Sequence, residues 1–123
     1  MPVPILKQGD VLIASIQAAL SDRDLVEFRD DVATRVGSLR ARGLIIDVTA
    51  LDVLDSFATR TLRGIAYTAK LRGANTVVVG IQPDVAFAMV ELGLSLEGIA
   101  TALDLEEGLA LLSQRSGQRG GRS

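Results

Sequence analysis

Four side chains that could do chemistry lie within ten consecutive residues: Asp47, Asp52, Asp55 and Ser56. The three aspartates follow an apolar run typical of a buried strand, so we expect them at the carboxyl end of a sheet, where α/β domains often place sites. Three carboxylates could hold Mg²⁺ or supply a general base. No Lys or His lies in this segment to complete an acid–base pair. Aspartates near a helix start commonly cap the helix, and we favour that interpretation.

Ser56 stands immediately before a helical pattern that begins at Phe57. On local grounds Ser56 or Asp55 is the N-cap, whose side-chain oxygen accepts a hydrogen bond from a backbone N–H group. A hydroxyl at a helix N-terminus can also carry a phosphate, because the N–H groups and the helix dipole favour negative charge there. Phosphorylation would add about −1.5 to −2 charge beside Asp52 and Asp55 and could repel a partner that docks on this loop.

Several other kinds of chemistry are excluded by the residues that the sequence lacks. It contains no Cys and no His, which removes thiolate nucleophiles, disulfides, Ser-His-Asp catalysis and nearly every zinc site. Twelve Gly are present, but neither G-x-x-x-x-G-K-S/T nor a G-x-G-x-x-G between a strand and a helix occurs. We therefore expect no cofactor, no metal site and no enzymatic activity.

The composition favours a small globular domain. A chain of 123 residues with 48% apolar content has room for one domain with a sizeable core. Aromatic residues make up only 3% and the formal charge is −2, so we expect no nucleic-acid partner. The first residues lack the basic and apolar regions of a signal peptide, and no apolar run is long enough to cross a bilayer. We expect a cytoplasmic protein without a membrane partner.

The first half of the chain predicts a hairpin and a helix. Two short apolar runs at 3–6 and 11–16 flank the turn formers Gly9 and Asp10. Ser21 and Asp24 then have the spacing of a capping box, and Gly43 is a natural helix stop. The apolar residues between them recur at helical spacing: Leu25, Phe28, Val32, Val36 and Leu39.

The second half alternates strands and helices. Runs 44–48 and 76–80 suit central strands buried on both faces, and 99–102 suits a last short strand. Helical patterns cover 56–71, 83–92 (from Pro83, with Gly93 after its end) and 104–112. Residues expected to face inward are Phe57, Leu62, Ile65, Ala66, Ala69, Leu105, Leu109 and Leu112. This order predicts an α/β fold with a mixed sheet of four to five strands and about four helices, most on one face.

The last nine residues differ in composition from the rest. Residues 115–123 hold three Gly, three Arg and no aliphatic side chain, which predicts a flexible tail after a domain at 1–114. Without these Arg, ten Lys and Arg stand against fifteen Asp and Glu. The predicted domain therefore carries a formal charge of −5.

Segment 44–57, LIIDVTALDVLDSF, resembles the signature of the STAS-domain anti-sigma-factor antagonists, in which a buried strand is followed by Asp-Ser and a helix. Within that family the chain is most similar to the RsbS-type scaffold subunits of the bacterial stressosome. This closer likeness is carried by segments 4–7, 15–17, 47–52, 76–83 and 90–94. Together the segments extend over about residues 3–113.

The resemblance implies a non-enzymatic signalling scaffold. RsbS-type chains assemble with RsbR-type STAS paralogues and sequester a serine kinase of the RsbT type. The kinase phosphorylates the serine that matches Ser56 and is released, and a phosphatase of the RsbX type resets the state. We expect residues flanking Ser56 to contact the partner, and the chain to form at least a dimer. The expected contact residues are Asp52, Asp55, Phe57, Thr59 and Arg60.

Some alternatives stay open. In RsbR-type paralogues a second phosphorylated Thr lies near the start of the first helix, and whether a second site exists near Ser21 is undecided here. A stand-alone antagonist similar to SpoIIAA would share Ser56 but would not form a large assembly. A small nucleotide-binding protein is less favoured, because the phosphate-binding loop is missing.

Overall fold

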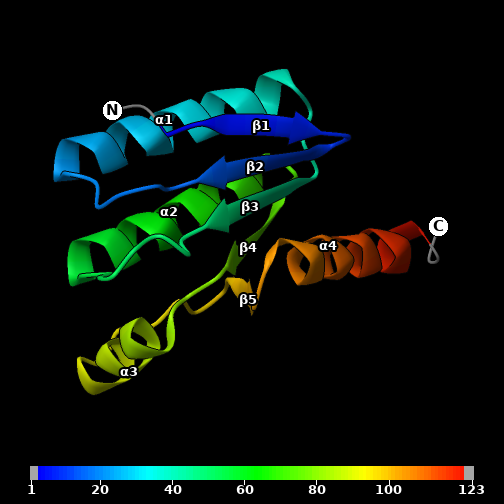
Figure 1. Cartoon of the computed structure of the whole chain (residues 1–123). Helices are drawn as coiled ribbons and strands as arrows, with labels where there is room; N and C mark the ends of the chain where they lie inside the picture. Colours follow the sequence, from blue (N-terminus) through cyan, green and yellow to red (C-terminus); the bar gives the residue numbers. More distant parts are fainter. Residues whose placement is uncertain (1–2, 121–123) are drawn as a thin grey trace.

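The computed structural model describes residues 3–120, and the side chains of residues 3–114. Five strands and four helices are found in this part of the chain (Figure 1). No helix in it is both long enough and apolar enough to span a bilayer. The strands are β1 (Ile5–Gln8), β2 (Val11–Ser15), β3 (Gly43–Asp47), β4 (Asn75–Val79) and β5 (Ala100–Ala102). The helices are α1 (Asp22–Ser38), α2 (Ser56–Leu71), α3 (Pro83–Glu91) and α4 (Leu105–Gly120). The predicted α/β class is confirmed.

The strands form one mixed sheet in the order β1-β2-β3-β4-β5. β1 and β2 are the predicted antiparallel hairpin, and Gly9 in its turn has a φ of 61°. The other neighbouring pairs are parallel, and a helix connects the strands of each pair. β3 is the central strand, and Asp47 at its end pairs with Ser15 on one side and Val79 on the other. The loop after β3 therefore leaves from the middle of the carboxyl edge of the sheet.

The helices divide between two apolar clusters, because successive side chains of a strand point to opposite faces. Leu44 and Ile46 of β3 belong to the cluster that contains most of the buried residues of α1, α2 and α3. Ile45 belongs to the other cluster, with Leu112 of α4. The prediction that most helices share one side of the core is correct for α1, α2 and α3. Helix α4 covers the opposite face.

Two glycines allow α4 to approach the sheet closely. A Cβ atom at Gly108 would lie 2.8 Å from Val79 Cγ1, and one at Gly43 would lie 2.8 Å from Leu112 Cδ1. The prediction that Gly43 stops the first helix is wrong. Helix α1 ends at Ser38, and Arg40 takes the left-handed conformation with a φ of 50°. Gly43 is the first residue of β3, and a glycine is needed there because α4 packs too closely for a side chain.

The predicted inward faces are correct at most positions. The apolar residues expected inside α2 are buried apart from Phe57, which is half-buried. In α4 Leu112 is buried and Leu109 half-buried, whereas Leu105 is 37% exposed. Leu105 is the first residue of α4, so its side chain lies at the end of the helix, where the sheet covers it less.

Helix α4 continues past its predicted end at Leu112 and reaches Gly120. The predicted boundary between domain and tail after residue 114 therefore falls within a helix. Residues 121–123 of the predicted tail lie outside the described residues. The flexibility of the tail stays a prediction.

The capping box predicted at the start of α1 is present. Ser21 Oγ accepts a hydrogen bond from the Asp24 backbone N–H at 3.1 Å, and the Ser21 backbone N–H donates to Asp24 Oδ2 at 3.3 Å. Hydrogen bonding to Ser21 is the main cause that lowers the pKa of Asp24 below its ordinary value. The Ser21 hydroxyl is thus engaged in capping the N-terminus of α1.

We predict that Ser21→Ala lowers the free energy of unfolding by about 1 kcal/mol near neutral pH, because the Asp24 N–H loses its acceptor. Because the pKa of Asp24 is lowered in the folded protein, ionised Asp24 stabilises the fold at any pH above the ordinary aspartate pKa. This stabilisation is lost as the pH falls through the lowered pKa of Asp24. Urea unfolding of both proteins at neutral and acidic pH measures this. The difference between them should shrink on acidification; a constant difference contradicts the coupling to Asp24.

Candidate functional site at the start of helix α2

The loop between β3 and α2 is fixed at both of its ends. At its beginning Asp47 Oδ1 accepts hydrogen bonds from the Thr49 backbone N–H at 2.9 Å and from Thr49 Oγ1 at 2.6 Å. Farther along, Leu51 and Leu54 are buried in the core, with 6% and 5% exposure. Because these contacts hold the backbone, Asp52 and the residue after it are presented to solvent in a defined position.

Ser56 is the first residue of α2, and its side chain is exposed. Asp55 is the N-cap: its Oδ1 accepts a hydrogen bond from the Ala58 N–H at 2.8 Å, and its backbone oxygen accepts one from the Thr59 N–H at 2.9 Å. Of the two residues that the sequence offers as the cap, the structure selects Asp55. The Ser56 hydroxyl is therefore not used for capping. It stands on the surface in a helical turn whose first N–H groups lack acceptors within the helix.

Four of the five residues predicted to contact a partner reach the surface around Ser56. Asp52, Asp55 and Arg60 are exposed, and Phe57 is half-buried. Thr59 is only 1% exposed, and its hydroxyl donates to the backbone oxygen of Asp55 at 2.8 Å. The expectation for Thr59 is contradicted, because its side chain lies on the core side of the helix. The hydrogen bond from the Thr59 hydroxyl to Asp55 stabilises the first turn of α2.

Two of the three aspartates in this segment are engaged in hydrogen bonds within the chain. Asp47 is committed to Thr49, and Asp55 to the helix cap. Among the residues that the structure describes, no group of three or more carboxylates could hold a metal ion. The capping interpretation is therefore correct for Asp55, while Asp47 fixes the turn after its strand.

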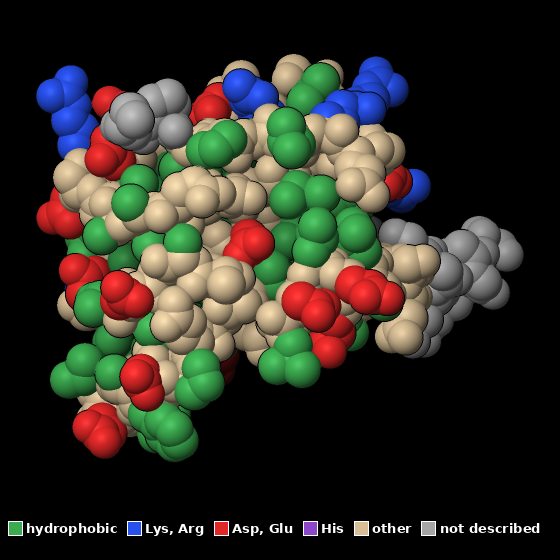
Figure 2. All heavy atoms as spheres, viewed as in Figure 1, with side chains coloured by type: hydrophobic (Ala, Val, Ile, Leu, Met, Phe, Trp, Pro, Cys, Tyr) green, Lys and Arg blue, Asp and Glu red, His purple; other side chains and the backbone are tan. Residues whose placement is uncertain are grey.

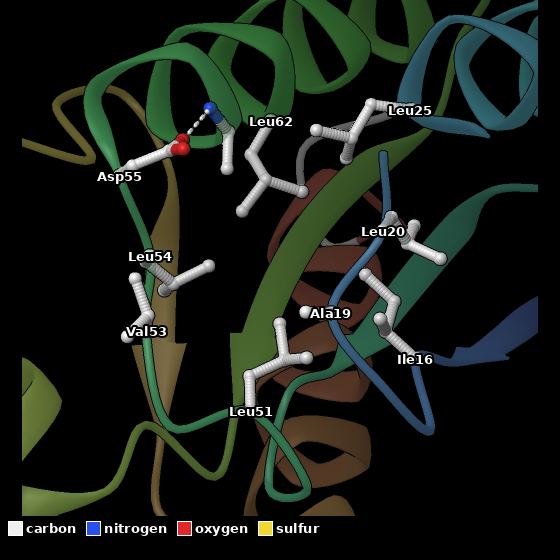
Figure 3. A pocket seen from close by; sticks show the side chains of 10 residues that line it. Ile16, Ala19, Leu20, Leu25, Leu51, Val53, Leu54, Asp55 and Leu62 are labelled. Carbon is white, nitrogen blue, oxygen red and sulfur yellow. Dashed lines mark hydrogen bonds between the residues drawn. The ribbon is translucent and has the colours of Figure 1, made fainter. Parts of the chain in front are cut away.

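A small apolar pocket lies beside Asp55 (Figure 3). Leu51, Val53 and Leu54 line it from the loop before α2, and Ile16 and Leu20 line it from the segment after β2. Val53 is apolar and yet 66% exposed. The remaining lining residues are Ala19, Leu25, Asp55, Ala58 and Leu62.

The sequence analysis assigned no role to three residues that position this loop, which are Thr49, Gly80 and Gln82. Gln82 Nε2 donates to the backbone oxygen of Thr49 at 2.6 Å, which links the loop after β3 to the loop after β4. Gly80, with a φ of 81°, lies against Thr49 so closely that a Cβ atom would overlap Thr49 Oγ1. The only sequence signal was the glycine at the last position of the predicted strand 76–80, because glycine in a strand often marks close approach of another backbone.

Comparison with known proteins places this geometry in a family. A family model described as the STAS domain matches residues 3–108. Three curated relatives from Bacillus subtilis (strain 168) are RsbT co-antagonist proteins. RsbRD is 26% identical over 81 residues, 66% of this chain and 29% of its own length. RsbRA is 29% identical over 70 residues, 57% of this chain and 26% of its own. RsbRC is 33% identical over 67 residues, 54% of this chain and 24% of its own. This chain thus spans less than a third of their length.

Solved structures resemble the chain over nearly its full length. A Ser-to-Glu variant of Moorella thermoacetica RsbS is 38% identical, has a TM-score of 0.79, and is matched over 93% of this chain and 97% of its own. A structure of the stressosome, described as a signal integration and transduction hub, contains a chain that is also 38% identical, with a TM-score of 0.75 and coverage of 92% and 98%. Unphosphorylated SpoIIAA is 14% identical, with a TM-score of 0.67 and coverage of 92% and 97%, and shares the fold.

The expected resemblance to the STAS domain is therefore confirmed, as is the likeness to RsbS. A sheet with this strand order, a helix that starts at an exposed Asp-Ser pair, and the family match over residues 3–108 agree with one another. The chain belongs to the STAS-domain family.

Proposed function

We propose that this chain is a scaffold subunit of a stressosome-type signalling assembly, which holds a serine kinase and releases it once Ser56 is phosphorylated. The observation that carries the proposal is the position of Ser56. Its side chain is exposed at the first position of α2, while Asp55 provides the cap. A kinase can reach this hydroxyl without opening the fold, and a phosphate can be added without removing a capping interaction.

The modification is a simple transfer. The terminal phosphoryl group of ATP passes to Ser56 Oγ, the hydroxyl proton goes to a base of the kinase, and ADP leaves. The product is an ester at the N-terminus of a helix, where backbone N–H groups and the helix dipole stabilise negative charge. We therefore expect the phosphorylated domain to stay folded.

Charge explains why phosphorylation would release the partner. Asp52 and Asp55 already place two carboxylates on the exposed surface next to Ser56. A phosphate adds about −1.5 to −2 more. A partner surface that accommodates two carboxylates then faces roughly twice as much negative charge, and close approach of like charges costs binding energy. The apolar pocket lined by Val53 and Leu54 would supply the uncharged part of the contact.

The partners follow from the relatives. The likeness to RsbS and to a stressosome chain supports assembly with STAS paralogues of the RsbR type. The name of those paralogues, RsbT co-antagonist, supports an RsbT-like serine kinase as the bound partner. A phosphatase of the RsbX type would complete the cycle, in the cytoplasm.

The test is phosphorylation by the cognate kinase with labelled ATP. Wild-type protein should incorporate about one phosphate per chain, and Ser56→Ala should incorporate none, with an unchanged circular dichroism spectrum, because Ser56 is exposed and does not cap the helix. Ser21→Ala is the matched control, since it removes the other serine at a helix start and should leave incorporation unchanged. Label on the Ser56→Ala protein would refute Ser56 as the phosphorylated residue. Loss of label in Ser21→Ala would assign phosphorylation to Ser21 instead.

A further inference from the structure

Gly64 has no explanation within a single chain. It lies in the middle of α2, it is exposed, and a Cβ atom there would meet nothing within 4 Å among the described residues. Glycine inside a helix is destabilising relative to alanine, because it has more conformational freedom to lose. Neither packing nor a positive φ requires it at this position. Close approach of a second backbone to this face of α2 would account for it.

The surface around Gly64 is apolar and basic. Tyr67 and Leu71 are 65% and 70% exposed, and the spacing of 3 or 4 residues places them on the same side of the helix as Gly64. The charged residues beside them all carry positive charge, and Ser56–Leu71 contains no carboxylate. We call this surface the α2 stripe; it consists of Arg63, Gly64, Tyr67, Lys70 and Leu71, and it leaves out Arg60, which belongs to the surface around Ser56.

A surface of opposite charge lies on α3. Phe87 and Val90 are 70% and 78% exposed, with Asp84 and Glu91 exposed beside them. We call these four residues the α3 patch. Residues 73–114 contain six Asp and Glu and no Lys or Arg. In Figure 2 the lower part of the view, where Figure 1 draws α3, carries hydrophobic and acidic side chains.

We propose that the α2 stripe of one copy of this chain docks on the α3 patch of a second copy. Each surface joins exposed apolar side chains to charges of one sign, and the signs are opposite. Pairing α2 with α2, or α3 with α3, would bring like charges together, which is disfavoured. The lengths also agree, because at 1.5 Å per residue residues 63–71 and α3 each extend over roughly 13 Å.

A second copy fits the α2 stripe better than the kinase does. The surface around Ser56 that the kinase must contact carries Asp52 and Asp55, so a kinase surface suited to these two carboxylates is not suited to Arg63 and Lys70. The contact is distinct from the phosphorylation site but rests on the scaffold part of the proposed function. Phosphorylation of Ser56 can be measured in the same variants. This measurement distinguishes a wrong assignment of the contact between copies from a wrong assignment of the phosphorylation site.

The test uses two charge-reversed proteins and sedimentation velocity over a range of concentrations. Arg63→Glu/Lys70→Glu changes the α2 stripe, and Asp84→Lys/Glu91→Lys changes the α3 patch. Each variant alone should associate at least about tenfold more weakly than wild type, because like charges then face one another. An equimolar mixture of the two should associate again, since a reversed stripe meets a reversed patch. Both should still be phosphorylated on Ser56.

Arg23→Glu/Arg29→Glu on α1 is the matched control for the α2 variant: it makes the same change in net charge outside both surfaces and should leave association unchanged. Gly64→Ala provides a second measurement. It should raise the midpoint of thermal unfolding of the dilute monomer and weaken association, a combination that a merely structural glycine would not give.

Three results would overturn the proposal. The first is a wild-type chain that stays monomeric up to about 1 mM, a concentration at which even weak contacts are populated. The second is a mixture of the two reversed variants that does not associate. The third is an α2 variant that keeps its mass but loses the kinase, which would assign the stripe to the kinase.

Discussion

Ser56→Asp should release the kinase without any phosphorylation. We expect the dissociation constant of the complex between this chain and its kinase to rise by about ten- to a hundredfold, which corresponds to about 1.4 to 2.8 kcal/mol. The change is large because the new carboxylate joins Asp52 and Asp55 on one exposed surface, and like charges brought together at an interface cost binding energy.

The helix itself should tolerate the substitution. Ser56 is at the first helical position, where acidic side chains interact favourably with the helix dipole. The first turn of α2 contains no acidic residue in the wild-type protein. Thermal stability of Ser56→Asp should therefore equal or slightly exceed that of wild type, so a loss of kinase binding cannot be attributed to unfolding.

Ser56→Asn is the matched control for kinase release. Asn has nearly the size and shape of Asp but no charge, and it should keep the dissociation constant within about threefold of wild type if charge is the cause. Isothermal titration or a pull-down with the purified kinase measures both variants. If Ser56→Asp holds the kinase as tightly as wild type, release by repulsion is wrong even if Ser56 is the phosphorylated residue. If both variants lose the kinase, shape rather than charge matters at this position.

The fold could be predicted from the sequence wherever periodicity and capping residues agreed. For α1 the apolar spacing and the Ser21–Asp24 box gave the start of the helix, and for α2 the predicted bounds are those observed. Prediction failed where long-range packing decides. Nothing near Gly43 in the sequence indicates that α4, from the far end of the chain, will lie on it. The length of α4 was missed because its last residues lack the apolar repeat on which the prediction relied.

The candidate site was predictable in part for similar reasons. That Ser56 begins a helix follows from local pattern, and its exposure follows from its place at the helix end. The burial of Thr59 was missed, although its spacing of three residues from Leu62 puts both on the same side of α2. The contact between Thr49 and Gln82 joins residues 33 positions apart. Such contacts depend on the register of neighbouring strands, which the sequence alone does not give.

Gly80 is the position where the fold and the site depend most directly on each other. It follows β4, and its backbone N–H donates to Ala102 of β5 at 3.1 Å. On its other side it lies against Thr49, whose hydroxyl donates to Asp47 Oδ1. A side chain at this position must displace that hydroxyl. The loop that leads to Ser56 is therefore held in place partly by the absence of a Cβ atom.

We predict that Gly80→Ala lowers the free energy of unfolding by about 3 kcal/mol or more. The backbone φ of 81° is unfavourable for alanine, and the new Cβ atom would overlap Thr49 Oγ1. Gly73→Ala is the matched control: its φ is 97°, but a Cβ atom there meets nothing within 4 Å. It should therefore cost only the conformational part, about 1 to 2 kcal/mol. Urea unfolding of the three proteins measures both effects.

A second substitution separates the steric contact from the strained backbone. In Gly80→Ala/Thr49→Ala the hydroxyl is gone, and the nearest remaining atom of residue 49, its Cβ, would lie 3.1 Å from the new methyl group. The double variant should therefore be more stable than the sum of the single changes predicts, by about 1 kcal/mol or more. Because Thr49 also fixes the loop before Ser56, Gly80→Ala should slow phosphorylation under conditions where the protein is still folded. Equal destabilisation by Gly80→Ala and Gly73→Ala, with unchanged phosphorylation, would show that Gly80 serves only the turn and not the site.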